Sequence, residues 1–400
     1  MFRIIPIFCA MAATLIVAAQ TRASVVNNSN TVRIGINESM PDTFAFSPTG
    51  DMVFVEDGAQ PDDVSLVHRS SGGVLITLEG QNFGSSIVGA PAVSSNGVVS
   101  FQCVGPGVDG VYARSTSGGE RITIHGASFG SAQGAPSVSS DGAIAFHGSE
   151  GIYVRESLAG ATHLTIQGQN FSRMGRPAIN TALNSDVCVA VSVDDGSGLP
   201  PVDAVYVQHG GGGFQGTLPN LPLNGRFSSG QPKIIDNKKS VLACFQSDSP
   251  TGLVESLMMC DFDETQSAYS EFRAIATFSD GSTCDRFSIC PDGEFMCATL
   301  DGGSKLIWSP RSNFNTFGPE SGGYVDPITI LSYGDVLGTS TVESITIADG
   351  SAQLDGSVMF HATLADGSSG LYLSMLPEPT TLVTAAAFAA LAVSRKRRSL

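Results

Sequence analysis

The chain has 400 residues, and at about 100 to 200 residues per domain this length allows two or three domains or one large repetitive β body. Its 46 glycines and 20 prolines, with only 14% charged residues, exclude a disordered chain or a long coiled coil and indicate a turn-rich globular protein. The formal net charge of -16, with basic residues partly concentrated at the termini, argues against a nucleic-acid partner.

Residues 1–23 have the pattern of a secretory signal peptide. Arg3 supplies the positive charge, the run from Ile4 to Ala19 is apolar, and Thr21-Arg22-Ala23 is a small-residue cleavage pattern before Ser24. The alternative is an N-terminal core helix, but no polar face interrupts the run. The pattern therefore predicts export through Sec-type machinery and secretion of the mature chain.

Between residues 24 and 376, one sequence pattern recurs seven times. The segments APAVSSNGVVSF, ending at Phe101, and APSVSSDGAIAF, ending at Phe146, are nearly superimposable. The steps between successive copies are 47, 45, 45, 54, 52 and 63 residues, against roughly 40 to 50 for a propeller blade. The weaker copies end at Phe54, Val191, Phe245, Cys297 and Phe360.

Each copy predicts four short strands. In the third copy, Pro136 to Ser140 alternates in the manner of a strand, Asp141-Gly142 predicts a tight hairpin with a positive φ, and Ala143 to Phe146 returns. Gly151 to Arg155 is the expected third strand and His163 to Ile166 the fourth. No stretch between residues 25 and 375 has a sustained helical period, so we expect no substantial helix.

The repeat predicts an all-β fold, a β-propeller of seven four-stranded blades over residues 24–376. Six or eight blades and an open β-solenoid are the alternatives. The seventh copy ends at residues 370–373 without a fourth strand, whereas residues 31–37 have strand character and no partner. We therefore expect residues 31–37 to close the last blade, next to residues 369–374.

The C-terminal residues 377–400 combine a short motif, an apolar segment and a basic tail. Pro377-Glu378-Pro379 precedes the uncharged stretch from Thr380 to Val393, and Arg395-Lys396-Arg397-Arg398 follows. This layout resembles the PEP-type (PEP-CTERM) sorting signal of Gram-negative bacteria. The resemblance implies transient membrane insertion, processing by an exosortase-like enzyme, and delivery to the cell envelope or extracellular matrix. An ordinary tail anchor, with a transmembrane helix, is the alternative.

The repeated glycine, apolar pair and phenylalanine resemble secreted tandem-repeat proteins with an NxxGxxxxAF pattern, which often carry C-terminal sorting anchors. The segments Asn96-Gly97 to Phe101 and Asp141-Gly142 to Phe146 carry the resemblance best, and it extends over about 330 residues. The fourth copy departs from it at Asp186-Val187-Cys188-Val189, and the sixth has Cys297 at the aromatic position. The resemblance implies an architecture and a cellular location but no activity.

No catalytic residues are predicted. Gly126-Ala127-Ser128-Phe129-Gly130 matches the G-x-S-x-G pattern of serine hydrolases, but the neighbouring copies lack the serine, so we interpret it as a turn. The histidines have no paired metal-binding spacing. We expect a non-catalytic protein, with an exported propeller hydrolase or lyase acting on glycans as the alternative. The six histidines are His68, His125, His147, His163, His209 and His361.

Loops that connect fourth to first strands and second to third strands gather on one face of a propeller, where ligands usually bind. This predicts a structural or ligand-binding protein, with exopolysaccharide as a candidate partner. The candidate contacts are Asn82, Phe83, Phe129, Asn170, Phe171, Asp194 and Asp195. Closely spaced acids could donate oxygens to calcium, although they do not match an EF-hand loop. These acids are Asp194, Asp195, Asp203, Asp261, Asp263 and Glu264; no other cofactor is expected.

Seven cysteines follow the signal peptide, and an oxidising exterior would allow disulfides with one thiol left over. We expect a bridge among Cys284, Cys290 and Cys297, or one between Cys244 and Cys260. The alternative is that the cysteines in second strands are small buried hydrophobic residues.

Overall fold

A computed structural model describes the chain in segments that cover most of the repeat region. The segments are 31–33, 44–57, 64–70, 75–79, 87–105, 109–117, 122–123, 135–148, 151–155, 163–166, 173–181, 187–194, 204–209, 215–217, 225–227, 231–235, 240–249, 252–263, 265–270, 273–278, 281–310 and 327–375. The predicted signal peptide and the predicted sorting signal lie outside the described residues. No helix in the described segments is long and apolar enough to cross a membrane.

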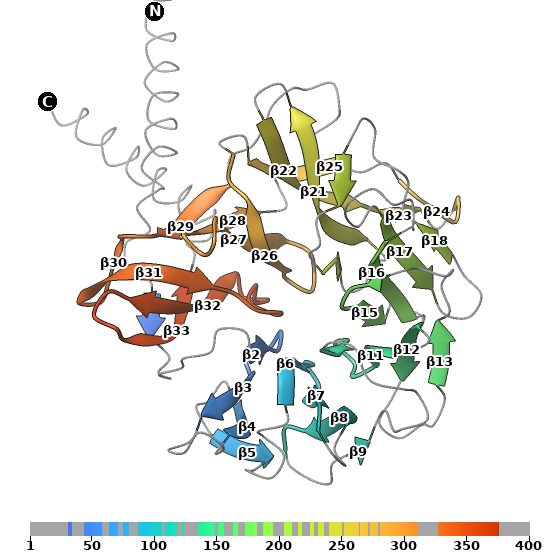
Figure 1. The fold of residues 1–400 in the computed structure, drawn as a ribbon, viewed down its shortest axis with the longest axis horizontal. Coiled ribbons are helices and arrows are strands. Elements are labelled where there is room, and N and C mark those ends of the chain that lie inside the picture. The colour runs from blue at the N-terminus through green and yellow to red at the C-terminus, as the bar shows by residue number, and fades with distance from the viewer. Residues whose placement is uncertain are drawn as a thin grey trace, which may run out of the picture.

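The described strands form seven antiparallel sheets of four or five strands and one separate hairpin, arranged in a ring (Figure 1). This confirms the predicted all-β propeller class. The first sheet contains β2 (Phe44–Phe46), β3 (Met52–Asp57), β4 (Val64–Arg69) and β5 (Leu75–Glu79). The second contains β6 (Ile87–Val93), β7 (Val98–Cys103), β8 (Gly110–Ser115) and β9 (Ile122–Thr123). The third contains β10 (Ser137–Val138), β11 (Ile144–Gly148), β12 (Gly151–Arg155) and β13 (His163–Ile166).

The next two sheets each have five strands. The fourth sheet contains β14 (Arg173–Met174), β15 (Ala178–Thr181), β16 (Val187–Asp194), β17 (Ala204–His209) and β18 (Gln215–Thr217). The fifth contains β19 (Gly225–Phe227), β20 (Lys233–Ile234), β21 (Val241–Ser249), β22 (Gly252–Cys260) and β25 (Arg273–Phe278). The separate hairpin is β23 (Phe262–Asp263) with β24 (Ala268–Tyr269).

The last two sheets complete the ring. The sixth contains β26 (Cys284–Ile289), β27 (Phe295–Leu300), β28 (Lys305–Pro310) and β29 (Ile328–Ser332). The seventh contains β30 (Val336–Leu337), β31 (Ser340–Thr346), β32 (Ser357–Leu364), β33 (Ser369–Met375) and β1 (Thr31–Arg33). The end points of the seven sequence copies all lie in the strand that pairs with the innermost one, namely β3, β7, β11, β16, β21, β27 and β32.

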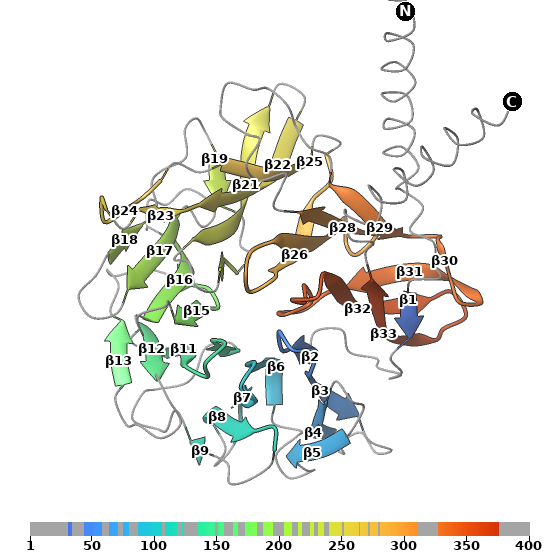
Figure 2. The same cartoon turned by 180° about the vertical axis from the view of Figure 1, so that it is seen from behind.

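The seventh sheet is closed by the strand nearest the start of the chain. β1 pairs antiparallel with β33, with Thr31 opposite Ser374, Val32 opposite Leu373 and Arg33 opposite Tyr372. Figure 2 shows β1 lying beside β33. This confirms that residues from the predicted closing segment complete the last sheet. The closure covers an edge of β33 that would otherwise present unpaired backbone groups.

The turns between first and second strands are built alike in several sheets. In the third sheet, the Ser139 N–H donates to Ala143 O at 2.8 Å and the Gly142 N–H donates to Ser139 O at 3.0 Å. Gly142 has a φ of 95°, as its place in the hairpin requires. The same pair of hydrogen bonds recurs in the turns that begin at Ser47, Ser94 and Gln353, and the turn at Cys290 is one residue longer, with its N–H donating to Phe295 O.

The hydrophobic core lies between neighbouring sheets, and the repeated aromatic position belongs to it. Phe101 stacks on Tyr112 of the next strand with ring centroids 5.8 Å apart, and Phe146 stacks on Tyr153 at 5.5 Å. Phe146 and Tyr153 pack in one cluster with Val98 of the preceding sheet. Stacked cross-strand pairs add about 0.5–1.5 kcal/mol each beyond their buried area, which explains why the pattern returns to an aromatic residue.

Candidate binding site at the centre of the ring

Three sheets have an innermost strand that is interrupted. β14 and β15 both pair with β16, and β19 and β20 both pair with β21. In the seventh sheet β31 pairs with β32, while Ala352 makes a separate bridge to Val358 of the same strand. Arg176, Gln231 and Asp349 lie at these interruptions. Since a break in the ladder re-aims side chains, the interruptions explain how polar groups reach the centre of the ring.

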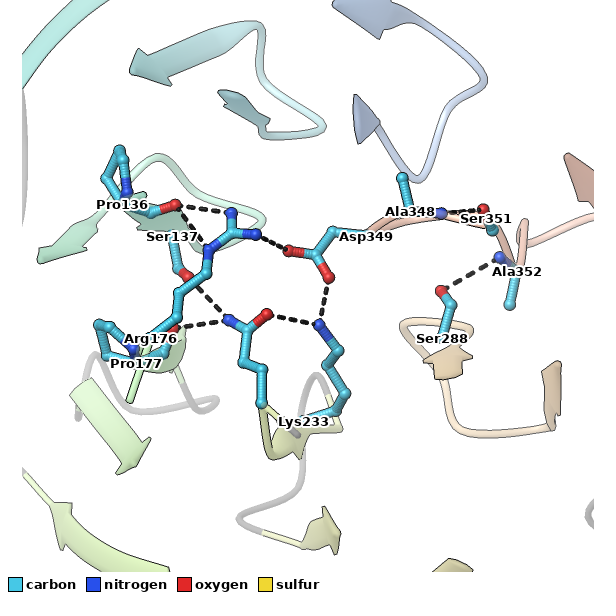
Figure 3. A network of polar contacts seen from close by, with 11 residues as sticks. Pro136, Ser137, Arg176, Pro177, Lys233, Ser288, Ala348, Asp349, Ser351 and Ala352 are labelled. Atoms are coloured by element: carbon cyan, nitrogen blue, oxygen red, sulfur yellow. Dashed lines mark hydrogen bonds and ion pairs between the residues drawn. The ribbon is translucent and has the colours of Figure 1, made fainter. Parts of the chain in front are cut away.

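Arg176, Lys233 and Asp349 form an ionic cluster at the centre of the ring (Figure 3). The Arg176 Nη1 atom lies 3.1 Å from Asp349 Oδ2, and Lys233 Nζ contacts the other carboxylate oxygen, Oδ1. Lys233 Nζ also donates to Gln231 Oε1 at 2.8 Å. Residues from the fourth, fifth and seventh sheets thus meet in one network.

Backbone carbonyls hold the cationic side of the network in place. Arg176 donates from Nη2 and Nε to the Pro136 carbonyl oxygen, at 2.7 and 3.2 Å. Gln231 Nε2 donates to the Pro177 carbonyl oxygen at 2.7 Å and to Ser137 Oγ at 3.0 Å. These contacts extend the network to the third sheet and fix the direction of the Arg176 guanidinium.

Asp349 is positioned by the first sheet. The Phe46 N–H donates to the Asp349 carbonyl oxygen at 2.9 Å. Gly350 follows with a φ of 74°, and a Cβ atom there would overlap the Phe46 carbonyl oxygen. Only glycine combines this backbone conformation with such a close approach. The junction between the first and seventh sheets therefore sets the position of the carboxylate.

The cluster is shielded from bulk water. The exposed fraction is 20% for the Arg176 side chain, 15% for Lys233 and 29% for Asp349. Burial lowers the pKa of Lys233, and the negative charge of Asp349 opposes this shift. Burial by itself would raise the pKa of Asp349, but the charges of Lys233 and Arg176 outweigh it and hold that pKa well below its ordinary value of 3.8. Asp349 is therefore ionised at neutral pH.

Two cavities flank the cluster, and Gln231, Lys233 and Asp349 line both. The larger, of about 370 Å³, lies where the innermost strands begin and also contacts Arg176 and Arg286. The smaller, of about 130 Å³, lies at the hairpin turns of the first, second, third and sixth sheets, and its lining includes Pro48, Ser94, Ser139 and Pro291. A volume of about 300–1,000 Å³ is usual for small-molecule sites, so the larger cavity has the size of a ligand site.

The larger cavity has an excess of positive charge. Arg176, Lys233 and Arg286 line it together with two carboxylates, Asp285 and Asp349. Asp285 accepts the N–H groups of Gly302 at 3.0 Å and Gly303 at 2.8 Å, so its charge is already held by the backbone. Among the described lining residues, three cations thus stand against two carboxylates. The arrangement suits recognition of an anion better than proton transfer.

Most of the predicted contact residues fall outside the described part of the chain. Asn82, Phe83, Phe129, Asn170, Phe171 and Asp195 lie there, and so do the calcium candidates Asp203 and Glu264. Asp194 ends β16, opposite Arg173.

The two remaining calcium candidates take part in local hydrogen bonds. Asp261 accepts the Ser240 hydroxyl at 2.6 Å. Asp263 accepts the Thr265 hydroxyl at 2.6 Å and the Thr265 N–H at 2.8 Å. These bonds from Thr265 lower the pKa of Asp263. Among the described residues, no group of three or more His, Cys, Asp or Glu side chains comes together to hold a metal.

The structure separates one predicted cysteine pair, Cys244 and Cys260, and places Cys290 and Cys297 of the other predicted group in the same cluster. Cys244 lies opposite Leu257 in the β21–β22 ladder, so Cys260, three residues further on, faces the other side of the sheet. Cys244 accordingly packs between the fifth and sixth sheets and Cys260 between the fourth and fifth. Cys284 packs with the cluster of Cys244, whereas Cys290 and Cys297 share the cluster between the sixth and seventh sheets. All six described cysteines have free thiols.

Sequence reasoning missed the central cluster, although the repeat carries a signal for it. Four residues before the start of the hairpin turn, the second and third copies have Ala90 and Ala135, each followed by proline. We call this the channel position. The same count places Arg286 and Asp349 at the channel position of the sixth and seventh copies. In the fourth and fifth copies, the proline that follows the channel position is Pro177 and Pro232. Alignment on this proline places Arg176 and Gln231 at the channel position.

The ring of sheets defines a β-propeller protein. No family model matches the chain, and no curated protein matches it. Solved propellers resemble it in fold. The β-propeller domain of Cps50 (Swd1) from Myceliophteria thermophila is 10% identical, with a TM-score of 0.48 over 87% of this chain and 98% of that one. The C-terminal WD40 domain of Sif2 is 15% identical, with a TM-score of 0.43 over 84% and 81%.

A structure from a study of two prolyl endopeptidases is also similar, at 13% identity and a TM-score of 0.50. The match covers 83% of this chain but only 50% of that one, so this chain spans half the length of the peptidase. At these identities the likeness concerns the fold alone.

Proposed function

We propose that the protein is an exported, non-catalytic binding propeller of the cell envelope or extracellular matrix, with the larger central cavity as its ligand site. The N-terminal pattern supports export, and the PEP-type C-terminal pattern supports processing by an exosortase-like enzyme and delivery to the cell surface. The observation that carries the proposal is the cavity of about 370 Å³ with its wall of fixed ionic groups. The proposed location in the envelope or matrix favours an exopolysaccharide as the ligand class.

The state of the two carboxylates supports a binding role over catalysis. Glycosidases need a pair of carboxyl groups, one of which must be protonated to act as the general acid. Asp349 is ion-paired with Arg176 and Lys233, which hold its pKa well below the ordinary value. Asp285 accepts two backbone N–H groups. The lowered pKa of Asp349 excludes that group as a proton donor at neutral pH.

The test combines a glycan array with a turnover assay on the same polysaccharides, using the exported protein. A variant that fills the cavity, Ala90→Trp, is matched by Leu354→Trp, which places the same side chain at an exposed turn residue outside both cavities. We expect binding without turnover, lost in Ala90→Trp and kept in Leu354→Trp. Turnover of any bound glycan would refute the non-catalytic role, and equal binding by both variants would refute the assignment of the cavity.

A further inference from the structure

The sign of the charge in the larger cavity is opposite to that of the protein. The chain as a whole has a formal net charge of -16, yet Arg176, Lys233 and Arg286 outnumber Asp285 and Asp349 in the cavity wall. Both carboxylates are already engaged, by Arg176 and Lys233 in one case and by backbone amides in the other. Among the described residues of the cavity wall, the cations therefore outnumber the carboxylates by one.

We propose, as a deepening of the proposed function on which it rests, that the larger cavity binds the carboxylate of an acidic monosaccharide unit. Arginine guanidinium groups match a planar carboxylate through two parallel N–H bonds. Arg286 lines the cavity beside Arg176, whose Nη1, Nη2 and Nε atoms already contact Asp349 and Pro136. The cavity also has apolar walls, Phe287 and Ile347, against which the carbon skeleton of a sugar can pack.

Size and charge set the length of the ligand. A volume of about 370 Å³ is near the lower end of the range for small-molecule sites, which suits one or two sugar units. The negative charge of the protein disfavours a long polyanion on its surface. The ligand is therefore a free hexuronic acid or the terminal uronate of a polysaccharide, since both present the same carboxylate.

Arg286 is the residue to change, because the ion pairs that hold Asp349 come from Arg176 and Lys233. Its charge nevertheless acts on the cluster, since it lowers the pKa of both Lys233 and Asp349. It lies at the channel position of the sixth copy, so its side chain belongs to the cavity wall. A neutral glutamine there removes one positive charge from the cavity wall.

The experiment is calorimetric titration of the exported protein with galacturonate, galactose, sulfate and an oligogalacturonide. We expect galacturonate to bind at least about tenfold more tightly than galactose or sulfate, which corresponds to one charge-assisted hydrogen bond. Arg286→Gln should weaken galacturonate binding by about tenfold or more. Lys305→Gln, which makes the same charge change outside the cavity, should leave galacturonate binding unchanged. Tighter binding of the oligogalacturonide than of galacturonate would identify a polysaccharide end as the source.

The outcomes separate this inference from the proposed function. Equal binding of galactose and galacturonate, blocked by Ala90→Trp, would overturn the acidic ligand while the binding site stands. Equal binding of sulfate, or galacturonate binding unaffected by Arg286→Gln, would also overturn it. If no glycan of any kind binds, the proposed function fails.

A separate observation concerns the junction of the fifth and sixth sheets, where two cysteines approach the same buried carboxylate. The Cys244 thiol donates to Glu255 Oε2 at 3.8 Å, and the backbone N–H of Cys284 donates to the same oxygen at 2.5 Å. Glu255 is only 3% exposed. Cys244 belongs to the cluster of buried residues against which Cys284 packs. The two thiols are therefore neighbours across the junction.

We infer that Cys244 and Cys284 form a disulfide in the exported protein. Formation removes one proton and one electron from each thiol, and the oxidant is the disulfide of an oxidoreductase in the exporting compartment, which is reduced to two thiols. A hydrogen bond with Cys244 and burial raise the pKa of Cys284 in the folded thiol form. Since the thiolate is the reactive species, oxidation precedes closure of the junction.

The test is non-reducing peptide mapping of the exported protein after alkylation under denaturing conditions. We expect one cross-linked pair containing Cys244 and Cys284, with Cys260 alkylated, because Cys260 faces a different cluster. Cys244→Ala, Cys284→Ala and the double variant should show the same loss of melting temperature, since each removes the same bond. Recovery of both residues in alkylated form from the wild-type protein would overturn the inference.

Discussion

Replacing Gly350 by alanine tests how the first and seventh sheets position the central carboxylate. Gly350 follows Asp349, has a φ of 74°, and lies where a Cβ atom would overlap the Phe46 carbonyl oxygen. The chain offers a matched control in Gly356, whose φ is 83° and whose Cβ would meet nothing within 4 Å. Both substitutions impose the same backbone strain and the same stiffening of the unfolded chain. Their difference therefore isolates the overlap.

The magnitude follows from these two contributions. A left-handed conformation costs an alanine about 1–2 kcal/mol, which is the whole effect expected for Gly356→Ala. Overlap with a neighbouring group adds about 1–3 kcal/mol, and here the neighbour is backbone, which cannot rotate away. Gly350→Ala should thus destabilise by about 2–5 kcal/mol. For a body of about 345 residues, with an unfolding entropy of about 2.1 cal/mol/K per residue, the difference lowers the melting temperature by roughly 1.5–4 °C.

Differential scanning calorimetry of the two variants and the wild-type protein measures this difference. Because the overlap displaces the Phe46 N–H to Asp349 O bond, Gly350→Ala should also weaken ligand binding at the larger cavity, whereas Gly356→Ala should leave it intact. Equal melting temperatures for the two variants would refute the claim that the close approach of Phe46 makes Gly350 necessary.

The remaining predictions concern charge, pH and processing. Asp349→Asn should lower the free energy of unfolding, measured by urea titration, by about 3 kcal/mol, because Arg176 and Lys233 would be left without their counter-charge. A loss below about 1 kcal/mol would instead mean that solvent screens the ion pairs of the cluster. Burial lowers the pKa of His68 from 6.5 in the folded protein, and the charge of Asp51 offsets part of this shift. The contribution of neutral His68 to stability is therefore present above pH 6.5 and is lost as the pH falls through the lower pKa of the folded state. His68→Phe should therefore flatten the fall of melting temperature below pH 6.5, and an unchanged pH profile would count against this. At lower pH, the contribution of Asp349 is present above its ordinary value of 3.8 and is lost below it, so Asp349→Asn should remove that part of the acid denaturation. Intact-mass measurement of the exported protein should show loss of residues 1–23 and of the basic tail; a mass that still contains Arg395 to Arg398 would contradict processing at the C-terminal motif.

The repeat made the architecture predictable because its strongest signals act locally. Asp141-Gly142 specifies a hairpin through a positive φ, and Phe146 returns at a fixed distance because it stacks on the next strand. The closing strand could be inferred by counting, since one copy lacked a strand and residues 31–37 had no partner. Both inferences needed only the order of strands along the chain.

The central cluster could not be derived in the same way. Arg176, Lys233 and Asp349 are far apart in the sequence, and they meet because three innermost strands are interrupted. Alignment of the copies marks Arg176 and Asp349 at the channel position, but it indicates neither the interruptions nor the contact with Lys233. The predicted pairing of Cys244 with Cys260 failed for a related reason. Cys244 and Cys260 lie in paired strands, but their register places them on opposite faces, and register is not written in spacing alone.

The pairing of β1 with β33 decides how the protein would carry mechanical load. β33 lies between β32 and β1, so it is flanked on both sides by partner strands. A pull on the chain beyond Met375 therefore acts on a strand held by seven residue pairs to one neighbour and three to the other. A tether at this end would load two ladders together.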